Sequence, residues 1–336
     1  MINIVLDGMG GDNAPESTVL GAVKAVNEFN DIKVTITGVK DKLNDLLSVQ
    51  NYDPEQIVVI DAPDTITMED TPTAAIKEKK DSSMVVGLNM VAQGEGDIFV
   101  SGGNTGALLA GATLIIRRAK GIKRSPLASQ IPSASGSVLL LDLGANVDCK
   151  PEYLKQFAVL GSIFMEKVAD VKDPRVGLLN NGAEEHKGNM LTKESYQLLK
   201  ECESINFAGN AEASQIMSGD FDVVVADGFV GNVVLKLLEG TAKTVFNGLK
   251  DSIGSSFKGK MGALMLKDSL RGLKKSFDYK EYGGALMLGL NRGVIKAHGS
   301  SDDRAIYNAL ALARKFVNAD VVNVINSALK DNNGDE

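Results

Sequence analysis

The stretch GDIFVSGGNTGALLAGATLII, residues 96–116, contains the unit from which we expect the whole fold to be built. An apolar strand comes first, then the small and polar residues 102–106, and then a helical pattern. Such a loop brings backbone N–H groups close to a ligand, and the helix that follows presents the positive end of its dipole. The loop therefore predicts a site for an anion, with phosphate favoured. A tight strand-to-helix turn capped by Asn104 is the alternative.

The same unit recurs along the 336 residues. We expect strands in the runs INIVLDG, IKVTITG, IVVIDAP, DIFVSGG, VLLLDLGAN, RVGLLNNG, INFAGN, DVVVADGF and VIKAHGSS. Helical patterns separate most of them, at residues 16–29, 72–93, 104–119, 152–169, 192–203, 232–250 and 303–328. This alternation predicts an α/β fold with parallel strands and crossover helices. We expect one α/β/α unit over residues 1–330, with residues 331–336 as a disordered tail.

Polar residues follow many of the expected strands. In open α/β sheets a ligand binds beyond the carboxyl ends of the strands, so these positions predict a binding cleft. Ordinary turn chemistry is the alternative for any single loop. We expect phosphate or substrate to contact Gly103, Asn104, Thr105, Gly106, Asn146, Asp227, Gly228 and His298.

Composition excludes several classes of protein. The net charge of −7 and the 5% aromatic content argue against nucleic-acid binding, which needs basic and stacking surfaces. Cys149 and Cys202 lie too far apart in sequence for a zinc or redox motif. The first residues read as a strand rather than a signal peptide, and no apolar run is long enough to span a membrane. We expect a cytoplasmic protein that requires no metal.

Lys187 lies among carboxylates and glycines in the loop NNGAEEHKGN, residues 180–189. A fixed ammonium there would neutralise phosphate or a developing oxyanion, and an ion pair with Glu184 or Glu185 is the alternative. Asn232 opens an apolar helix, which it would cap, or it would offer its amide N–H to an anion. Nothing in the sequence around Cys149 indicates a lowered pKa, so a covalent cysteine mechanism is disfavoured.

Residues 253–277 form a basic amphipathic segment in an acidic chain. Apolar residues follow two helical faces that are out of phase, which predicts a kink or hairpin near residues 262–265. An apolar face with a basic rim is typical of a helix that lies on a membrane surface. The alternatives are a dimer interface, a core helix with solvated lysines, or a basic surface that binds an acidic protein partner. The residues expected to contact a membrane are Phe257, Met261, Leu264, Lys267, Leu270, Arg271 and Lys274.

Several of these strings together resemble the PlsX family of bacterial phosphate acyltransferases over nearly the whole chain. The motifs are DGMGGDNAP (7–15), MEDTPTAAIKEKKDSSM (68–84), SGGNTGALLAG (101–111), LLDLGANVDCKPEYL (140–154), LLNNGAEEHKGN (178–189), FAGNAEA (207–213), DVVVADGFVGNVVLKLLEG (222–240) and KAHGSS (296–301).

The resemblance implies a Rossmann-like α/β/α sandwich, similar to isopropylmalate dehydrogenase and phosphotransacetylase, assembled as a homodimer. It implies transfer of a long-chain acyl group from acyl carrier protein to inorganic phosphate for phospholipid synthesis, without a nucleotide cofactor. Lys187 and Asn232 match the positions assigned to catalysis, and the segment 253–277 would contact the inner face of the cell membrane. A soluble phosphotransacetylase acting on acyl-coenzyme A is the alternative.

Overall fold

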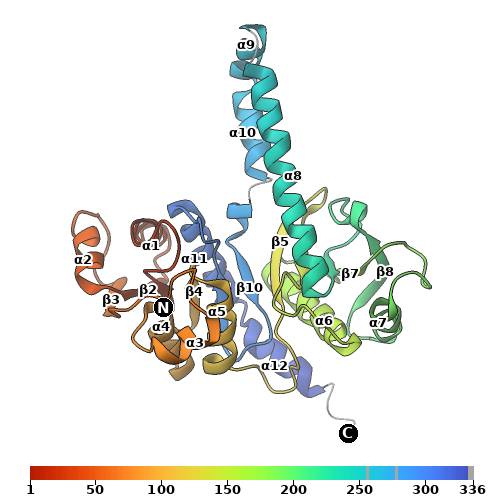
Figure 1. Cartoon of the computed structure of the whole chain (residues 1–336), viewed down its shortest axis with the longest axis horizontal. Helices are drawn as coiled ribbons and strands as arrows, with labels where there is room; N and C mark the ends of the chain where they lie inside the picture. Colours follow the sequence, from red (N-terminus) through yellow and green to blue (C-terminus); the bar gives the residue numbers. More distant parts are fainter. Residues whose placement is uncertain (255–256, 277–278, 332–336) are drawn as a thin grey trace.

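The computed structural model of the chain describes residues 1–254, 257–276 and 279–331. For residues 254, 257, 258, 260, 263, 271, 273–276, 279, 280 and 329–331 it describes the backbone alone. The expected tail, apart from Asp331, therefore lies outside the described residues. Figure 1 shows a wide α/β body with a long helical hairpin projecting from it.

The described strands form one mixed sheet in the order β3-β2-β1-β4-β11-β10-β5-β6-β9-β7-β8. Their bounds are β1 Ile2–Asp7, β2 Ile32–Gly38, β3 Ile57–Asp61, β4 Ile98–Ser101, β5 Leu127–Ser133, β6 Gly136–Leu141, β7 Arg175–Asn180, β8 Asn206–Glu212, β9 Val223–Val225, β10 Ala285–Met287 and β11 Gly293–Lys296. All nine expected strands are present, whereas β5 and β10 were not anticipated. The expected α/β fold is confirmed, but the sheet is not parallel throughout.

The sheet consists of two parallel blocks that run in opposite directions. Strands β3, β2, β1, β4 and β11 form one block, and β6, β9, β7 and β8 form the other. Between the blocks, β10 pairs antiparallel with both β11 and β5, and β5 pairs antiparallel with β6. The all-parallel expectation implied that all carboxyl ends lie at one edge of the sheet. Because the blocks run in opposite directions, their carboxyl ends instead lie at different edges.

The helices are α1 Glu16–Glu28, α2 Lys40–Ser48, α3 Pro72–Glu78, α4 Ser83–Gln93, α5 Thr105–Gly111, α6 Pro151–Val168, α7 Met190–Lys200, α8 Gly228–Gly254, α9 Phe257–Met265, α10 Lys267–Ser276, α11 Asp303–Asn318 and α12 Val321–Asp331. Short helical turns are η1 Ala112–Ile116, η2 Ala213–Gln215 and η3 Tyr279–Tyr282. Three expected helices were too long. The predicted helix at 72–93 is two helices, the one at 104–119 ends at residue 116, and the one at 303–328 breaks before Val321. Helix α2 was missed.

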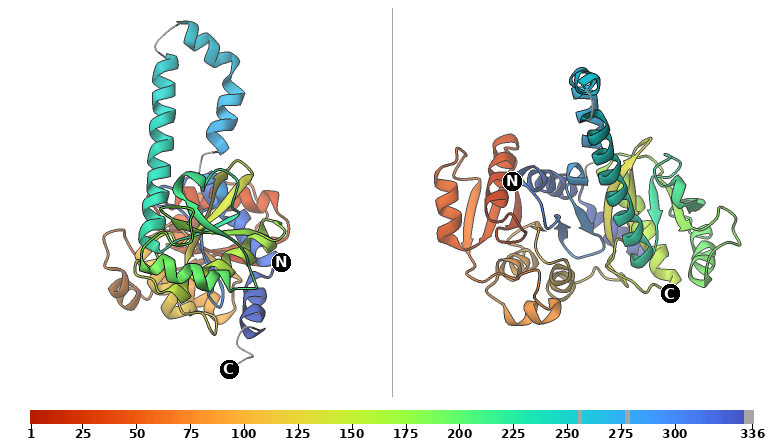
Figure 2. Two further views of the ribbon diagram at one scale, coloured as in Figure 1. Left: turned by 90° about the vertical axis from the view of Figure 1, so that its right-hand side faces the viewer. Right: turned by 45° about the horizontal axis from the view of Figure 1, so that its top comes forward.

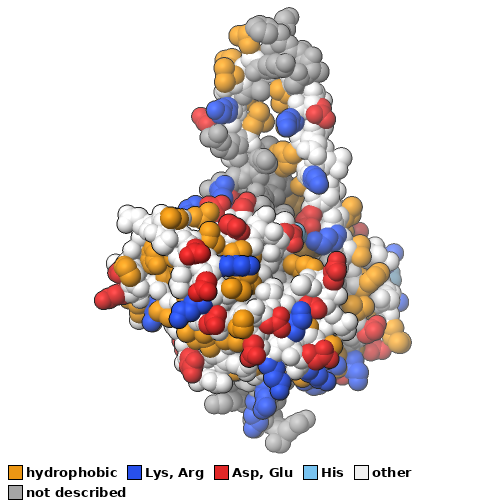
Figure 3. Space-filling model, turned by 60° about the vertical axis from the view of Figure 1, so that its left-hand side comes forward, with side chains coloured by type: hydrophobic (Ala, Val, Ile, Leu, Met, Phe, Trp, Pro, Cys, Tyr) orange, Lys and Arg blue, Asp and Glu red, His pale blue; other side chains and the backbone are white. Residues whose placement is uncertain are grey.

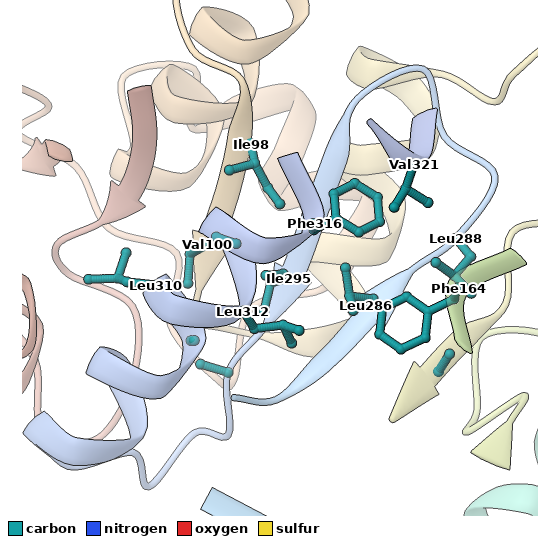
Figure 4. Packing of buried hydrophobic residues seen from close by; sticks show 14 of the residues in the cluster. Ile98, Val100, Phe164, Leu286, Leu288, Ile295, Leu310, Leu312, Phe316 and Val321 are labelled. Atoms are coloured by element: carbon teal, nitrogen blue, oxygen red, sulfur yellow. The ribbon is translucent and has the colours of Figure 1, made fainter. Parts of the chain in front are cut away.

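Two apolar clusters cover the two faces of the sheet, because successive strand residues point to opposite sides. On β4, Ile98 and Val100 belong to one cluster with helices α1, α6 and α11, whereas Phe99 belongs to the other with α4 and α5. Figure 4 shows the first cluster, in which Leu310 and Phe316 of α11 lie close to β4 and β11. The expected α/β/α layering is therefore present.

Helix α8 begins on the body and extends far beyond it, and α9 and α10 return toward the body (Figure 2). The predicted break in the segment 253–277 is confirmed, because α9 ends at Met265 and α10 begins at Lys267. Among the described helices, none combines the length and the apolar character needed to cross a bilayer.

Candidate active site

The loops after β1, β4 and β11 are tied together at the carboxyl edge of the first block. The backbone N–H of Asp12 donates to the carbonyl of Gly299 at 2.8 Å, and the Asn13 side chain donates to the carbonyl of Ser301 at 3.1 Å. Gly11 has a φ of +120°, and a Cβ there would lie 3.0 Å from the Gly299 carbonyl oxygen. Glycine at this position therefore lets the loops approach one another.

The side chain of Asn104 is fully engaged in structure. Its Oδ1 accepts from the backbone N–H of Ala107 at 3.1 Å, which caps α5 as the alternative interpretation predicted. Its Nδ2 donates to the carbonyls of Thr67, Met68 and Asp70 at 3.1 to 3.3 Å. Any anion at this loop would therefore meet backbone N–H groups and the exposed Thr105 rather than the Asn104 amide.

Two buried ionisable residues near this loop, Lys296 and Asp7, were missed by the sequence analysis. Lys296 donates from Nζ to the carbonyl of Gly102 at 3.1 Å, and Asp7 accepts from the Ser101 hydroxyl at 2.7 Å. Burial lowers the pKa of Lys296 to about 8, although the charges of Asp7 and Asp12 oppose this shift. Burial also raises the pKa of Asp7. A lysine within the apolar run VIKA was the available signal.

At the carboxyl edge of the second block, the buried carboxylate of Asp142 shapes the loop after β6. Oδ1 accepts from the backbone N–H groups of Leu127 and Ala145 at 2.9 and 3.1 Å. Oδ2 accepts from the backbone and the side chain of Asn146 at 2.7 and 2.8 Å. The Asn146 side chain also donates to the carbonyl of Ser125 at 3.0 Å. The side chain of Asn146, a residue expected to contact phosphate or substrate, is therefore used to orient the loop.

Helix α8 starts against this loop, four residues earlier than expected. Gly228 donates from its backbone N–H to the Asn146 carbonyl at 2.8 Å. The Asp227 carboxylate accepts from the N–H groups of Phe229 and Val230 at 3.0 and 2.9 Å, so Asp227 caps the helix. The alternative that Asn232 caps this helix is therefore wrong, whereas its expected role toward an anion stays a prediction. Asn232 is instead an exposed residue in the second turn, 3.7 Å from where a Cβ of Gly144 would lie.

Lys187 lies in the loop after β7, the strand next to β9 in the same block. Its backbone is held by hydrogen bonds from its own N–H to the Glu184 carbonyl and from Asn180 Nδ2 to its carbonyl, at 3.0 and 3.2 Å. Its stem covers Gly182, where a Cβ would lie 2.9 Å from Lys187 Cγ. Glu185 pairs with Lys200 at 3.1 Å, and no ion pair joins Lys187 to a described residue.

The first turns of α8 connect the two groups of loops. His298 follows β11, and its Nδ1 accepts from the Ser300 N–H at 3.2 Å. Partial burial lowers the pKa of His298, and the charge of Lys236 adds to the shift whereas Glu239 opposes it. Lys236 is one turn beyond Asn232 and is paired with Glu239 at 2.8 Å. His298 of the first block therefore lies near the part of α8 that carries Lys236 and Glu239, one to two turns beyond Asn232.

No activated protein nucleophile is evident among the candidate residues. Burial and the charge of Asp142 raise the pKa of the Cys149 thiol to about 12, so the thiol is protonated at neutral pH. Lys187 and Lys236 supply positive charge, and the His298 ring and backbone N–H groups supply hydrogen-bond donors, which suit an anionic ligand. The arrangement can therefore bind phosphate and stabilise an oxyanion, but it offers no thiolate for covalent catalysis.

A cavity of about 770 Å³ lies elsewhere, and none of the predicted site residues lines it. It opens between η1, α11 and α12, with Arg117, Arg292, Asp97 and Asp320 among its lining residues. Its mixture of two arginines and two acids defines no ligand. We therefore place the candidate site by hydrogen bonds and charge rather than by the size of a cavity.

The hairpin places part of the expected membrane-contact set on its surface. Met261 is 55% exposed and Leu264 is 73% exposed, Lys267 is exposed, and Leu270 is partly buried. The side chains of Phe257, Arg271 and Lys274 lie outside the described residues. Met265 and Leu266, which were not predicted, are 86% and 56% exposed. Figure 3 shows hydrophobic side chains along the projecting hairpin.

Comparison with solved structures supports the fold. The chain is similar to a phosphotransacetylase from Streptococcus pyogenes, with a TM-score of 0.64 and 18% identity, covering 96% of this chain and 94% of that chain. At this identity the likeness shows the fold alone, and it confirms the expected phosphotransacetylase-like architecture.

Sequence relatives extend over nearly the whole chain. A phosphate acyltransferase from Clostridium perfringens strain SM101 is 48% identical over 96% of this chain and 95% of that protein. One from Clostridium novyi strain NT is 48% identical over 98% of this chain and 99% of that protein. Residues 2–324 match the family described as "Fatty acid synthesis protein". The chain therefore belongs to this fatty acid synthesis protein family, the PlsX family that its motifs resemble, whose relatives carry the name phosphate acyltransferase.

Proposed function

We propose that this phosphate acyltransferase moves a long-chain fatty acyl group from acyl carrier protein to inorganic phosphate, giving acyl phosphate for phospholipid synthesis. The proposal rests on Lys187 and Asn232, two polar residues of the second block. Both follow strands of the same parallel block, and neither side chain is joined by a hydrogen bond or ion pair to a described residue. Polar side chains that make no hydrogen bond or ion pair within the described protein are available to a ligand.

In this reaction the protein has to position phosphate and the thioester and to supply positive charge and hydrogen-bond donors. Phosphate is the nucleophile, and its oxygen attacks the thioester carbonyl to form a carbon–oxygen bond. The carbonyl re-forms as the carbon–sulfur bond breaks, and the thiolate leaves with the carrier. Lys187 holds phosphate and stabilises the tetrahedral oxyanion, and Asn232 donates a hydrogen bond to either group. We assign binding of phosphate or acyl phosphate to Gly103, Thr105, Gly106, Gly228 and His298.

The α8–α10 hairpin favours a long acyl chain and a lipid surface over the alternative of a soluble enzyme acting on acyl-coenzyme A. Its exposed Leu264, Met265 and Leu266 have no use in a reaction between soluble substrates. The likeness of the fold to a phosphotransacetylase supports the alternative, an enzyme that acts on acyl-coenzyme A. In our proposal the protein is cytoplasmic and binds the inner face of the cell membrane through this hairpin.

We also propose a homodimer. On α8, Phe229, Val233 and Leu237 are 63%, 52% and 66% exposed and recur every fourth residue, so they form an apolar stripe on one side of the helix. A second copy of the chain would cover this stripe. Sedimentation of the purified protein tests the dimer, and a monomer at micromolar concentration would contradict it.

The test of the reaction is to incubate the enzyme with palmitoyl-acyl carrier protein, with and without inorganic phosphate, and to follow release of the free thiol. We expect release only with phosphate. Release without phosphate would indicate a thioesterase and would overturn the proposal. Release from palmitoyl-coenzyme A but not from the carrier protein would establish the alternative.

A further inference from the structure

A basic surface lies outside the hairpin, in the segment RRAKGIKR, residues 117–124. Its eight residues contain five cations and no acid, in a chain whose net charge is −7. Four of the cations are exposed and Arg118 is partly buried. No ion pair joins any of the five to a described acid. We call these five residues, Arg117, Arg118, Lys120, Lys123 and Arg124, the basic patch.

The backbone of the segment is fixed, so the patch is not a loose loop. Ala119 and Ile122 are 3% and 6% exposed and anchor the segment in the body, and the guanidinium of Arg118 donates to the Lys123 carbonyl. Gln156 of α6 donates from Nε2 to the Gly121 carbonyl at 2.8 Å and accepts from the Lys123 N–H at 2.9 Å. A preorganised charged surface binds a partner with less loss of conformational entropy.

The patch borders the candidate active site. The segment leads into β5, which runs antiparallel to β6, so its end lies at the carboxyl edge of β6. The carbonyl of Ser125, the next residue, accepts from Asn146 Nδ2 at 3.0 Å. Asn146 in turn accepts from the N–H of Gly228, where α8 begins. Ser125 therefore joins the patch to the loop of Asn146, against which the helix that carries Asn232 begins.

We propose that the basic patch is the docking surface for acyl carrier protein. This inference rests on the proposed function, and it adds where the carrier binds. A carrier protein delivers its thioester on a flexible arm, so it must dock beside the site rather than inside it. A carrier that presents carboxylates matches five cations that form no ion pair with a described acid, and this complementarity steers its approach and fixes its orientation. The net charge of the whole chain is −7, so attraction of such a partner needs a local basic surface.

The test reverses charge within the patch. We expect Lys120→Glu combined with Lys123→Glu to raise KM for palmitoyl-acyl carrier protein roughly tenfold. The kcat and KM for phosphate should stay unchanged, as should turnover of the small thioester palmitoyl-pantetheine. Added salt should weaken the wild-type reaction more than that of the variant, because salt screens the attraction. The matched control is Lys40→Glu with Lys42→Glu, two exposed lysines on α2.

Each outcome separates the docking proposal from the proposed function. If the wild type transfers acyl groups from the carrier and the variant matches it in KM and salt response, the docking proposal is overturned and the function stands. Equal losses with the carrier and with the small thioester would indicate damage to the site and would also overturn docking. If the wild type shows no transfer from the carrier, the proposed function itself fails.

Discussion

The ammonium group of Lys296 donates to the carbonyl oxygen of Gly102 at 3.1 Å, directly beneath the loop that opens α5. Lys296 is 8% exposed, and Asp7 and Asp12 supply the acidic charges that act on it. A buried charge of this kind is destabilising unless it is paired and hydrogen-bonded. Its presence in the strand that ends at the candidate site suggests that it holds the backbone of residues 102–103 in position.

Lys296→Met tests this burial through the pH dependence of stability. The pKa of Lys296 is lowered from 10.5 to about 8 in the folded protein, so between these values the unfolded chain binds more protons. Stability therefore rises with pH across this window in the wild type. We expect urea unfolding to show that the wild type gains about 2 kcal/mol relative to Lys296→Met between pH 7.5 and 9.5. Lys193→Met on α7 is the control, and identical pH slopes for wild type and Lys296→Met would contradict the assignment.

Much of the fold could be predicted because its signal is local. Apolar runs that end in Gly, Asn or Asp mark the buried parallel strands, and all nine were found. β5, with the sequence LASQIPS, lacks a β-branched run, and β10 has only three residues, so neither resembles a strand. Their antiparallel pairing reverses the second block, and this reversal is a tertiary property that no local pattern contains.

The site was predictable by residue type but not by role. Asn104, Asn146 and Asp227 lie where strand ends were expected, yet each side chain bonds to protein backbone. Such roles depend on partners that are distant in sequence, for example Ser125 for Asn146. Lys296 and Asp142 were missed as structural groups because burial cannot be read from one charged residue in an apolar run.

Gly231→Ala should separate α8 from β6. A Cβ at Gly231 would lie well inside contact distance of the Asp142 carbonyl oxygen, which is backbone and cannot move aside easily. We expect loss of at least 1 kcal/mol of stability and a fall in activity, measured by urea unfolding and acyl phosphate formation. Gly240→Ala is the matched control, because nothing lies within 4 Å of its Cβ position in the same helix. It should stabilise the protein by up to about 1 kcal/mol, and equal effects of the two changes would refute the packing argument.

The hairpin should bind anionic vesicles through its exposed apolar residues. Met265→Asp combined with Leu266→Asp places two charges where a lipid surface is proposed, and we expect vesicle co-sedimentation to fall severalfold. Val49→Asp is the control, since Val49 is 78% exposed and follows helix α2, outside the hairpin. Unchanged sedimentation of the hairpin variant would remove the membrane from the proposal, while turnover of a short soluble thioester should be unaffected.

Lys187 and Asn232 should act on the chemical step rather than on folding. Lys187→Met removes the proposed charge beside phosphate, and we expect kcat/KM to fall roughly 100-fold or more, as when a donor to an oxyanion is lost. Asn232→Ala should cost a similar factor, and the double variant should lose less than the product of the two, because both groups serve one transition state. Lys187→Arg keeps the positive charge and should restore part of the activity.

The unfolding midpoint should stay near that of the wild type in each variant, since neither side chain is hydrogen-bonded to a described residue. Lys193→Met, which changes a lysine on the neighbouring helix α7, controls for loss of surface charge. Full activity of Lys187→Met at saturating phosphate would exclude Lys187 from catalysis. A higher KM for phosphate with unchanged kcat would instead limit its role to binding.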